Sequence, residues 1–92
     1  MLPIFGKMFG GHGIFHAGLM IGLVADDTLY LKADADSAAE FTDRGLAQFM
    51  YPKGGKMVGM SYFLAPEEVL DDPAEMRVWA QFAYEAALRA KK

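Results

Sequence analysis

The chain has 92 residues, no cysteine and a formal net charge of −3 at pH 7. This length suits one domain, and the lack of cysteine excludes a disulfide framework and a thiolate metal site. The longest apolar stretch, residues 13–25, is shorter than the roughly 20 residues that a membrane-spanning helix needs. The N-terminus also lacks the pattern of a secretory signal. We therefore expect a single cytoplasmic domain over residues 1–92, with no membrane segment.

The charge pattern disfavours a protein that binds duplex DNA tightly by itself. Such proteins usually carry a basic face that displaces counterions from the phosphates. Here the acidic residues outnumber the basic ones, and the basic residues are spread along the whole chain: Lys7, Lys32, Arg44, Lys53, Lys56, Arg77, Arg89, Lys91 and Lys92. We interpret them as solvated surface charge.

The first third of the chain has the pattern of an antiparallel meander. Residues 1–8 are an apolar lead, interrupted by Pro3 and Gly6, that suits either a strand or an arm. The run F-G-G-H-G at residues 9–13 indicates a sharp turn or a bulge. Three strands are then predicted over residues 14–16, 19–25 and 28–32. Ala17 and Gly18 form the first turn between them, and Asp26 and Asp27 form the second.

The strand at residues 28–32 alternates most cleanly. Leu29 and Leu31 fall on one face, while Thr28, Tyr30 and Lys32 fall on the other. A helix is predicted next, over residues 34–44. Ser37 is its predicted N-cap, with Glu40 completing a capping box three residues later, and Gly45 suits the left-handed position after the helix.

The remaining elements are two strands and a long helix. Strands are predicted over residues 49–51 and 57–64, joined by a turn at residues 52–56, and one helical turn over residues 66–70. The terminal helix has the clearest signals: Asp72 as N-cap, Pro73 at the first helical position and Glu75 closing a capping box.

One face of the terminal helix is apolar, and the opposite face is polar. The apolar face comprises Met76, Trp79, Ala80, Ala83, Ala86, Ala87 and Ala90, and the polar one comprises Arg77, Gln81, Glu85 and Arg89. The alanines allow close approach to a sheet, and Trp79 is the main anchor. The sequence therefore predicts an α+β fold, in which helices pack on an antiparallel sheet of about five strands and the C-terminal helix covers one face.

No group of residues has the spacing of a catalytic or metal site. The glycine run lacks the Lys and the following helix of a phosphate loop, and no βαβ unit follows it. His12 and His16 lie about 13 Å apart along an extended strand, too far to share one metal unless the glycines fold the chain back. Asp26 and Asp27 are in a predicted turn. We therefore expect no catalytic residues, no cofactor and no metal.

The remaining candidates for function are the acidic and serine residues and the methionines. Asp71 and Asp72 are adjacent at a helix start, where Asp72 already has a capping role, and neither Ser37 nor Ser61 lies in a nucleophile motif. The seven methionines are numerous for this length. Those at Met8, Met50, Met57 and Met60 either fill the core or line an adaptable binding surface.

Five segments together resemble the N-terminal domain of TfoX, also called Sxy, a bacterial regulator of competence genes. In chain order they are M-F-G-G-H-G from Met8, A-D-D-T-L-Y-L-K from Ala25, M-S-Y-F from Met60, A-P-E-E-V-L-D-D-P from Ala65 and V-W-A from Val78. Their order and spacing extend the resemblance from about Met8 to about Ala90. The chain departs from the family at the start, where members usually have a helix, and it lacks the C-terminal helical domain of full-length regulators.

The resemblance implies a central antiparallel sheet flanked by helices, and a role in transcription at competence promoters together with the cyclic-AMP receptor protein. It carries no catalytic residues. We expect a non-enzymatic, protein-binding regulatory module, and the acidic balance favours a protein partner over direct contact with DNA. A small-ligand-binding domain, with a pocket between sheet and helix, is the alternative.

The apolar lead also predicts self-association. Leu2, Ile4 and Phe5 are apolar, and Pro3 prevents full pairing as a central strand. Exposed edges and apolar patches tend to find partners. We predict a homodimer in which residues 2–5 contact the second copy, the alternative being that the lead folds back onto its own sheet.

Overall fold

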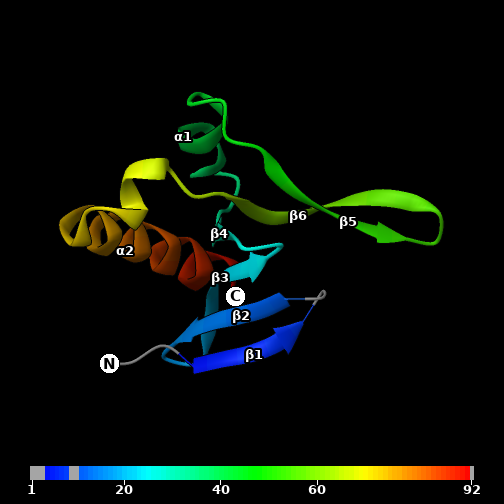
Figure 1. The fold of residues 1–92 in the computed structure, drawn as a ribbon, viewed down its shortest axis with the longest axis horizontal. Helices are drawn as coiled ribbons and strands as arrows, with labels where there is room; N and C mark the ends of the chain where they lie inside the picture. The colour runs from blue at the N-terminus through cyan, green and yellow to red at the C-terminus, as the bar shows by residue number, and fades with distance from the viewer. Residues whose placement is uncertain (1–3, 9–10, 92) are drawn as a thin grey trace.

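The computed structural model describes residues 4–8 and 11–91, which form one sheet with helices on one face (Figure 1). In chain order the elements are β1 (Ile4–Met8), β2 (Gly11–His16), β3 (Leu19–Ala25), β4 (Thr28–Lys32), α1 (Ala38–Thr42), β5 (Gln48–Lys53), β6 (Lys56–Leu64), the 3-10 helix η1 (Glu67–Leu70) and α2 (Pro73–Ala90). The predicted α+β class is confirmed.

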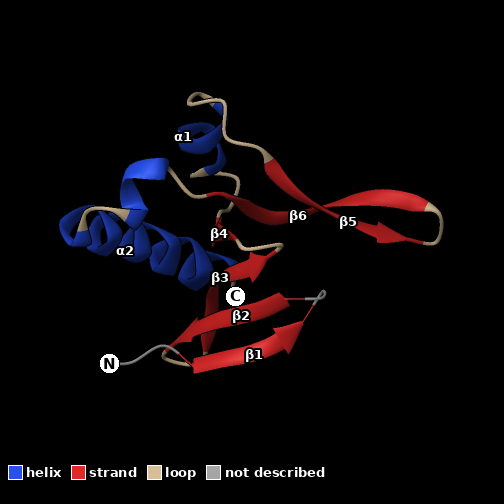
Figure 2. Ribbon diagram, viewed as in Figure 1, coloured by secondary structure: helices blue, strands red, loops and turns tan. Residues whose placement is uncertain are grey.

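The sheet has the strand order β1-β2-β3-β4-β6-β5, and every neighbouring pair is antiparallel. The predicted meander is therefore present in β2, β3 and β4, although β2 begins at Gly11 rather than at residue 14. The chain leaves the sheet after β4, forms α1, and returns through β5, so that β6 lies between β4 and β5. The strands β1 and β5 are the edges (Figure 2).

The apolar lead supplies the sixth strand. β1 pairs with β2 in the same chain, with Ile4 opposite Phe15 and Phe5 opposite Ile14. The strand alternative for this segment is thus confirmed for the backbone of Ile4–Met8, while Leu2 lies outside the described residues. Because β1 is an edge strand, its outer side has no strand of the same sheet beside it. The homodimer through residues 2–5 stays a prediction.

All three predicted turns between strands are two-residue hairpin turns. Both central residues have positive φ in each of them: Ala17 and Gly18 (52° and 80°), Asp26 and Asp27 (52° and 59°), Gly54 and Gly55 (59° and 80°). This is the type I′ geometry that matches the twist of the flanking strands. The turn predicted over residues 52–56 is therefore too long, because Pro52 and Lys53 continue β5 and Lys56 already begins β6.

Ser37 is the N-cap of the first helix, as predicted, but the capping box with Glu40 is not formed. Ser37 makes no capping bond with its side chain. Instead the Ser37 N–H donates to Asp34 Oδ1 at 3.0 Å, and the Asp34 N–H donates to Ser37 Oγ at 2.9 Å. This is the reciprocal bonding pattern of a capping box, formed here between Asp34 and Ser37 just before the regular helix. The regular helix is shorter than predicted and spans only Ala38–Thr42.

The predicted stop after α1 is confirmed. Gly45 has φ 73°, and its N–H donates to the Thr42 carbonyl, while the Leu46 N–H donates to the Phe41 carbonyl. These two bonds form a Schellman motif, which favours glycine at the left-handed position. The motif also directs Leu46 back toward the core that contains Phe41.

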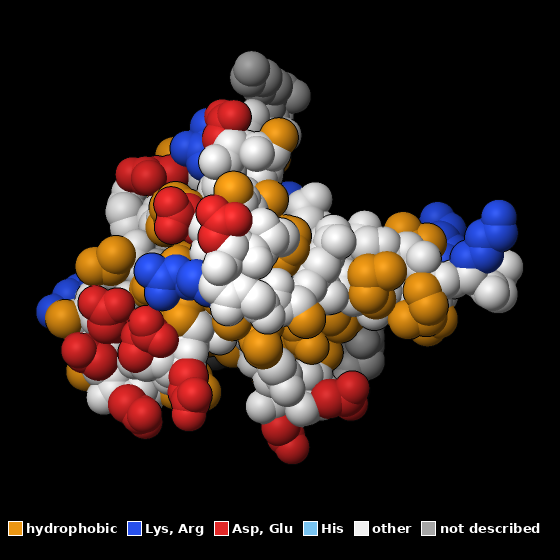
Figure 3. Space-filling view, turned by 90° about the horizontal axis from the view of Figure 1, so that it is seen from above, with side chains coloured by type: hydrophobic (Ala, Val, Ile, Leu, Met, Phe, Trp, Pro, Cys, Tyr) orange, Lys and Arg blue, Asp and Glu red, His pale blue; other side chains and the backbone are white. Residues whose placement is uncertain are grey.

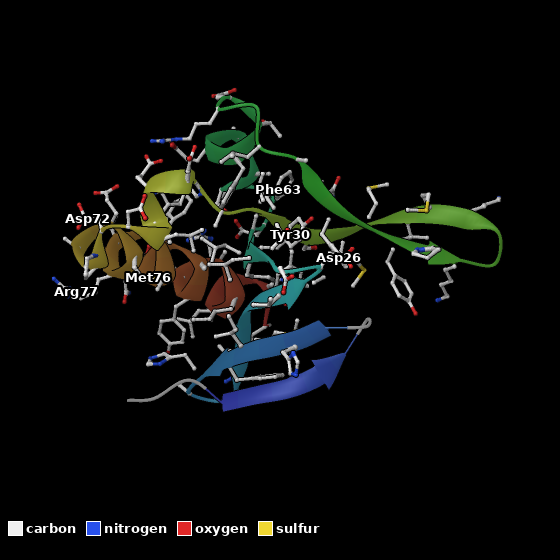
Figure 4. All side chains as sticks on the ribbon, viewed as in Figure 1. Asp26, Tyr30, Phe63, Asp72, Met76 and Arg77 are labelled. Carbon is white, nitrogen blue, oxygen red and sulfur yellow. The ribbon has the colours of Figure 1, made fainter. Side chains whose placement is uncertain are left out.

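The start of α2 matches most of its predicted signals. Asp72 accepts a hydrogen bond from the Ala74 N–H at 2.9 Å, and Pro73 is the first helical residue (Figure 4). The box with Glu75 is not formed, because the Asp72 N–H donates to the Glu68 carbonyl of η1 instead. In the part of the chain that the structure describes, no helix is long and apolar enough to cross a membrane.

The main core lies between the sheet and the helices. Trp79, Ala83 and Ala87 of α2 are buried there, together with sheet residues such as Leu31 and Phe63. Phe41 of α1 is fully buried among three other aromatic rings, with centroid distances of 5.4 Å to Phe63, 5.4 Å to Trp79 and 6.1 Å to Phe82. The predicted apolar stripe of α2 is thus confirmed at its centre, whereas Ala90 is exposed.

The opposite face of the sheet holds a second apolar cluster that the sequence did not predict. Its buried members are Leu23, Ala25, Phe49 and Tyr62, and the partly buried ones are Met20, Tyr30, Tyr51 and Met60. The rings of Tyr30 and Phe49 lie 5.0 Å apart, which ties β4 to the edge strand β5. The expected alternation in β4 is confirmed, since Leu29 and Leu31 pack on the main core and Tyr30 on this second cluster.

An ion pair joins the end of α2 to the segment that precedes α1. Arg89, near the end of α2, donates from Nε and Nη2 to the two carboxylate oxygens of Asp34, at 2.5 and 3.1 Å. The Asp34 side chain is 15% exposed. The hydrogen bonds from Arg89 and then those with Ser37 hold the pKa of Asp34 well below its ordinary value of 3.8. The start of the α1 segment is thereby linked to the end of the chain.

This ion pair predicts a specific loss of stability in acid. A carboxyl group with a lowered pKa in the folded state stabilises the fold above its ordinary pKa, and the contribution is lost as the pH falls below 3.8. We expect Asp34→Asn to melt at a lower temperature than wild type at neutral pH, and to lose less on acidification. Asp36→Asn is the control, since Asp36 is 80% exposed and 3.8 Å from Arg89 Nε. The melting temperatures of the three proteins are measured from neutral to acidic pH. An Asp34→Asn protein whose melting temperature falls with pH as much as that of wild type would contradict this prediction.

Candidate functional site

The hairpin of β5 and β6 extends away from the helical part of the molecule (Figure 1). At its base, Gln48 Nε2 donates to the Met60 carbonyl at 2.9 Å, and Phe49 is buried in the second cluster. Beyond the base, Met50, Met57 and Val58 are 43%, 60% and 41% exposed. These are half of the large apolar side chains that are exposed among the described residues. The hairpin is therefore anchored by its base and apolar along its free part.

The exposed apolar side chains lie on both faces of the hairpin. Met57 is opposite Pro52, and Val58 is opposite Tyr51, in neighbouring positions of the register. Since successive residues of a strand point to opposite faces, Met57 and Val58 face opposite sides. Lys53 and Lys56 form the last pair before the Gly54-Gly55 turn. We call Met50, Met57 and Val58, with Lys53 and Lys56, the hairpin patch (Figure 3).

A pocket of about 420 Å³ lies between α1 and α2. Its apolar lining is Val78, Trp79 and Phe82 of α2, of which Val78 is 61% exposed. The remaining lining residues are polar or charged: Glu40 and Arg44 from the α1 segment, and Glu75, Gln81 and Glu85 from α2. Glu75, Val78, Phe82 and Glu85 recur at helical spacing and so share one face of α2. We call this the α1–α2 pocket.

The charge of the α1–α2 pocket is negative. Arg44 is its one basic lining residue, and its guanidinium lies 4.9 Å from the centre of the Trp79 ring and 3.5 Å from the Glu68 carboxylate. Its charge is thus already shared with a carboxylate outside the lining. Gln81 Nε2 donates to Glu85 Oε2 at 3.3 Å, which places that carboxylate beside the pocket. The pocket combines an apolar floor with three carboxylates, and acidic side chains gather over the helical part of the surface (Figure 3).

A second pocket, of about 340 Å³, lies between the sheet and α2. It is lined by His16 and Ile21 from the sheet and by Arg77, Ala80, Gln81 and Tyr84 from the helix. The rings of His16 and Tyr84 meet edge-on at 4.8 Å. Arg77 points outward from the first half of α2 (Figure 4).

The candidate residues for catalysis or metal binding do not come together in one site. His12 is exposed on β2, whereas His16 packs against Tyr84. Asp26 and Asp27 form a hairpin turn, and Asp72 caps α2. Ser37 is engaged with Asp34. Across residues 4–8 and 11–91 no three His, Cys, Asp or Glu side chains are grouped closely enough to hold a metal ion.

Some of the methionines pack in the protein and others form exposed contact surface. Met60 is partly buried against the second cluster, whereas Met50 and Met57 are exposed on the hairpin. Met8 ends β1. The exposed pair is what an adaptable contact surface requires, because the flexible thioether side chain fits differently shaped partners.

Comparison with known protein families matches most of the chain to one family model. A search of curated proteins finds no match to the chain. The family model of the TfoX N-terminal domain matches residues 5–87, which covers β1 through most of α2 and agrees closely with the extent of the resemblance in the sequence. The six-stranded sheet with α2 packed upon it is therefore the form that this family takes here, and the chain belongs to the TfoX N-terminal domain family.

Proposed function

We propose that the chain is a non-enzymatic regulatory module that acts by protein–protein contact in the transcriptional control of competence genes. The observation that carries the contact is the hairpin patch, because a projecting hairpin with three exposed apolar side chains is typical of a docking element. Membership of the TfoX N-terminal domain family supports the regulatory role. The partner is a protein of the transcription machinery or another regulator, such as the cyclic-AMP receptor protein.

A genetic complementation experiment tests this proposal. The gene is deleted in the source organism, and competence-gene transcripts are measured after complementation with wild type, Met57→Asp or Leu88→Asp. Leu88 is the matched control, since it is an exposed apolar residue on α2, away from the hairpin. We expect wild type and Leu88→Asp to restore the transcripts and Met57→Asp to fail. Transcripts that do not respond to the deletion would overturn the proposal.

The charge distribution predicts that the purified protein does not bind duplex DNA tightly. The net charge is −3, and two of the arginines, Arg44 and Arg89, are already paired with carboxylates. Without a continuous basic face, little affinity comes from counterion release. We expect no nanomolar complex with random-sequence duplex at physiological salt in a fluorescence anisotropy titration. A nanomolar complex whose affinity falls steeply with salt would contradict this prediction.

The alternative function is a small-ligand-binding domain. It is favoured by the pocket between the sheet and α2, where His16 and Arg77 stand near Tyr84. Such a lining suits a small aromatic acid, since the cationic Arg77 attracts a carboxylate and the rings offer apolar contact. A series of such acids measured by the shift in melting temperature tests this reading, with Arg77→Gln as the variant that should lose the shift.

A further inference from the structure

The two surfaces of the functional site complement each other in both charge and polarity. On one face of the hairpin patch, Lys53 and Lys56 lie beside the exposed Val58, while Met57 is on the other face. The α1–α2 pocket presents Glu40, Glu75 and Glu85 around the apolar Val78, Trp79 and Phe82. Within one chain the hairpin points away from α1 and α2, which carry the lining residues of the pocket (Figure 1). Contact between the two surfaces therefore requires a second molecule.

We propose that the occupant of the α1–α2 pocket is the hairpin of a second copy of this chain, and that two copies form a reciprocal dimer. This goes beyond the proposed function, because the dimer contact uses the Val58 face of the hairpin, whereas the test of the regulatory contact changes Met57 on the opposite face. Each copy lays Val58 on the apolar floor of the pocket in the other, and Lys53 and Lys56, which share the face of Val58, meet the carboxylates at its edge. Both contacts bury apolar side chains that are exposed in the single chain, such as Val78.

The shape of the molecule allows both contacts at once. The β5–β6 hairpin lies at one end of the longest dimension, which is 39 Å, and α2, which carries most of the pocket lining, lies toward the other end (Figure 1). Two copies arranged side by side and antiparallel, around a twofold axis, therefore bring each hairpin to the other pocket. A twofold arrangement uses every contact twice and closes, whereas a head-to-tail arrangement of the same surfaces leaves one hairpin and one pocket free and continues into a chain of molecules.

The hairpin is suited to lie in an open pocket. Its tip consists of Gly54 and Gly55, which have no side chains, and their φ angles of 59° and 80° allow a two-residue turn. The tip is therefore narrow, and the lysines flank it instead of covering it. Long lysine side chains place their ammonium groups at the edge of a contact while their methylene groups cover apolar surface.

Reversal of charge on each surface separately gives a sharp test. One variant carries Lys53→Glu and Lys56→Glu, and the other carries Glu40→Lys and Glu85→Lys. All four are exposed side chains, so both proteins should fold, which circular dichroism and a cooperative melt confirm. Each variant alone brings like charges together in both contacts. We expect its dimer to be weakened at least about tenfold relative to wild type.

An equimolar mixture of the two variants restores opposite charges in both contacts of a mixed dimer. Sedimentation equilibrium should therefore show a dimer for wild type and for the mixture, and a monomer for each variant alone. Raised salt should weaken the wild-type dimer, because the carboxylates and ammonium groups are at the surface. A wild-type chain that is monomeric at about 100 μM, where even a weak complex would assemble, overturns the proposal. The proposal is also overturned if both charge-reversal variants remain dimers on their own, or if their equimolar mixture stays monomeric.

The same proteins separate this inference from the proposed function. The Glu40→Lys, Glu85→Lys variant leaves the hairpin patch unchanged, so its effect on competence-gene transcripts reports on the dimer alone. Transcripts that respond to Met57→Asp while wild type remains monomeric would reject the dimer and keep the regulatory contact. If wild type is a dimer but the competence-gene transcripts do not respond to the deletion, the regulatory function is rejected and the dimer is kept.

Discussion

Trp79→Ala is expected to lower the free energy of unfolding by about 3–5 kcal/mol, the usual cost of truncating a buried aromatic side chain. Trp79 is 6% exposed, and its ring meets Phe41 at 5.4 Å and Phe82 edge-on at 5.5 Å. It also supports the Arg44 guanidinium at 4.9 Å. Since a small domain has a total stability of about 5–15 kcal/mol, this loss leaves the protein close to unfolding at ambient temperature.

Thermal and urea unfolding followed by circular dichroism measure this effect. Val78→Ala is the control, because Val78 precedes Trp79 on α2 and is 61% exposed, and surface substitutions usually change stability by less than about 0.5 kcal/mol. A Trp79→Ala protein with the melting temperature of wild type would show that α2 does not dock through this residue.

The parts of the fold that the sequence predicted are those set by local signals. Asp72 and Pro73 stand where α2 begins, and Gly45 adopts the left-handed conformation after α1. These features depend on backbone groups within a few residues, so that residue type alone indicates them. The turns at Ala17-Gly18 and Asp26-Asp27 are likewise predicted by local residue type.

Other features could not be predicted because they depend on contacts between distant segments. Ser37 bonds to Asp34 instead of forming a capping box with Glu40, and the Asp34 carboxylate also receives Arg89 from the far end of the chain. The second cluster combines Leu23 with Phe49 and Tyr62, and this grouping exists only once β6 lies between β4 and β5. Alternation in β4 indicated two faces but did not indicate that both would be apolar.

The candidate site was partly visible in the sequence. The excess of methionine indicates either core or contact surface, and the sequence alone does not distinguish the two because strand periodicity does not show where a hairpin leaves the sheet. Met57 and Val58 are exposed because β5 and β6 continue beyond the strand β4, which pairs only with residues 62–64 of β6. The α1–α2 pocket joins Glu40 to residues more than thirty positions later, and no local pattern indicates such a pairing.

Phe41→Ala is expected to destabilise the protein at least as much as Trp79→Ala, by about 3–5 kcal/mol. Phe41 has no exposed surface and joins three elements, since its ring meets Phe63 of β6 and both Trp79 and Phe82 of α2. It also belongs to a helix of only five residues, which has little stability of its own. Its removal therefore opens a cavity and releases α1 from the core at the same time.

A double-mutant cycle with milder substitutions tests whether Phe41 and Trp79 act as one unit. Phe41→Leu and Trp79→Phe keep most of the apolar volume, so all four proteins of the cycle should remain folded. Because the two rings are in contact, we expect the losses to be non-additive by about 0.5–1.5 kcal/mol, the coupling typical of an aromatic pair. Urea unfolding of the four proteins gives the coupling energy. Additive losses would mean that α1 and α2 are held to the sheet independently, and that Phe41 does not join them.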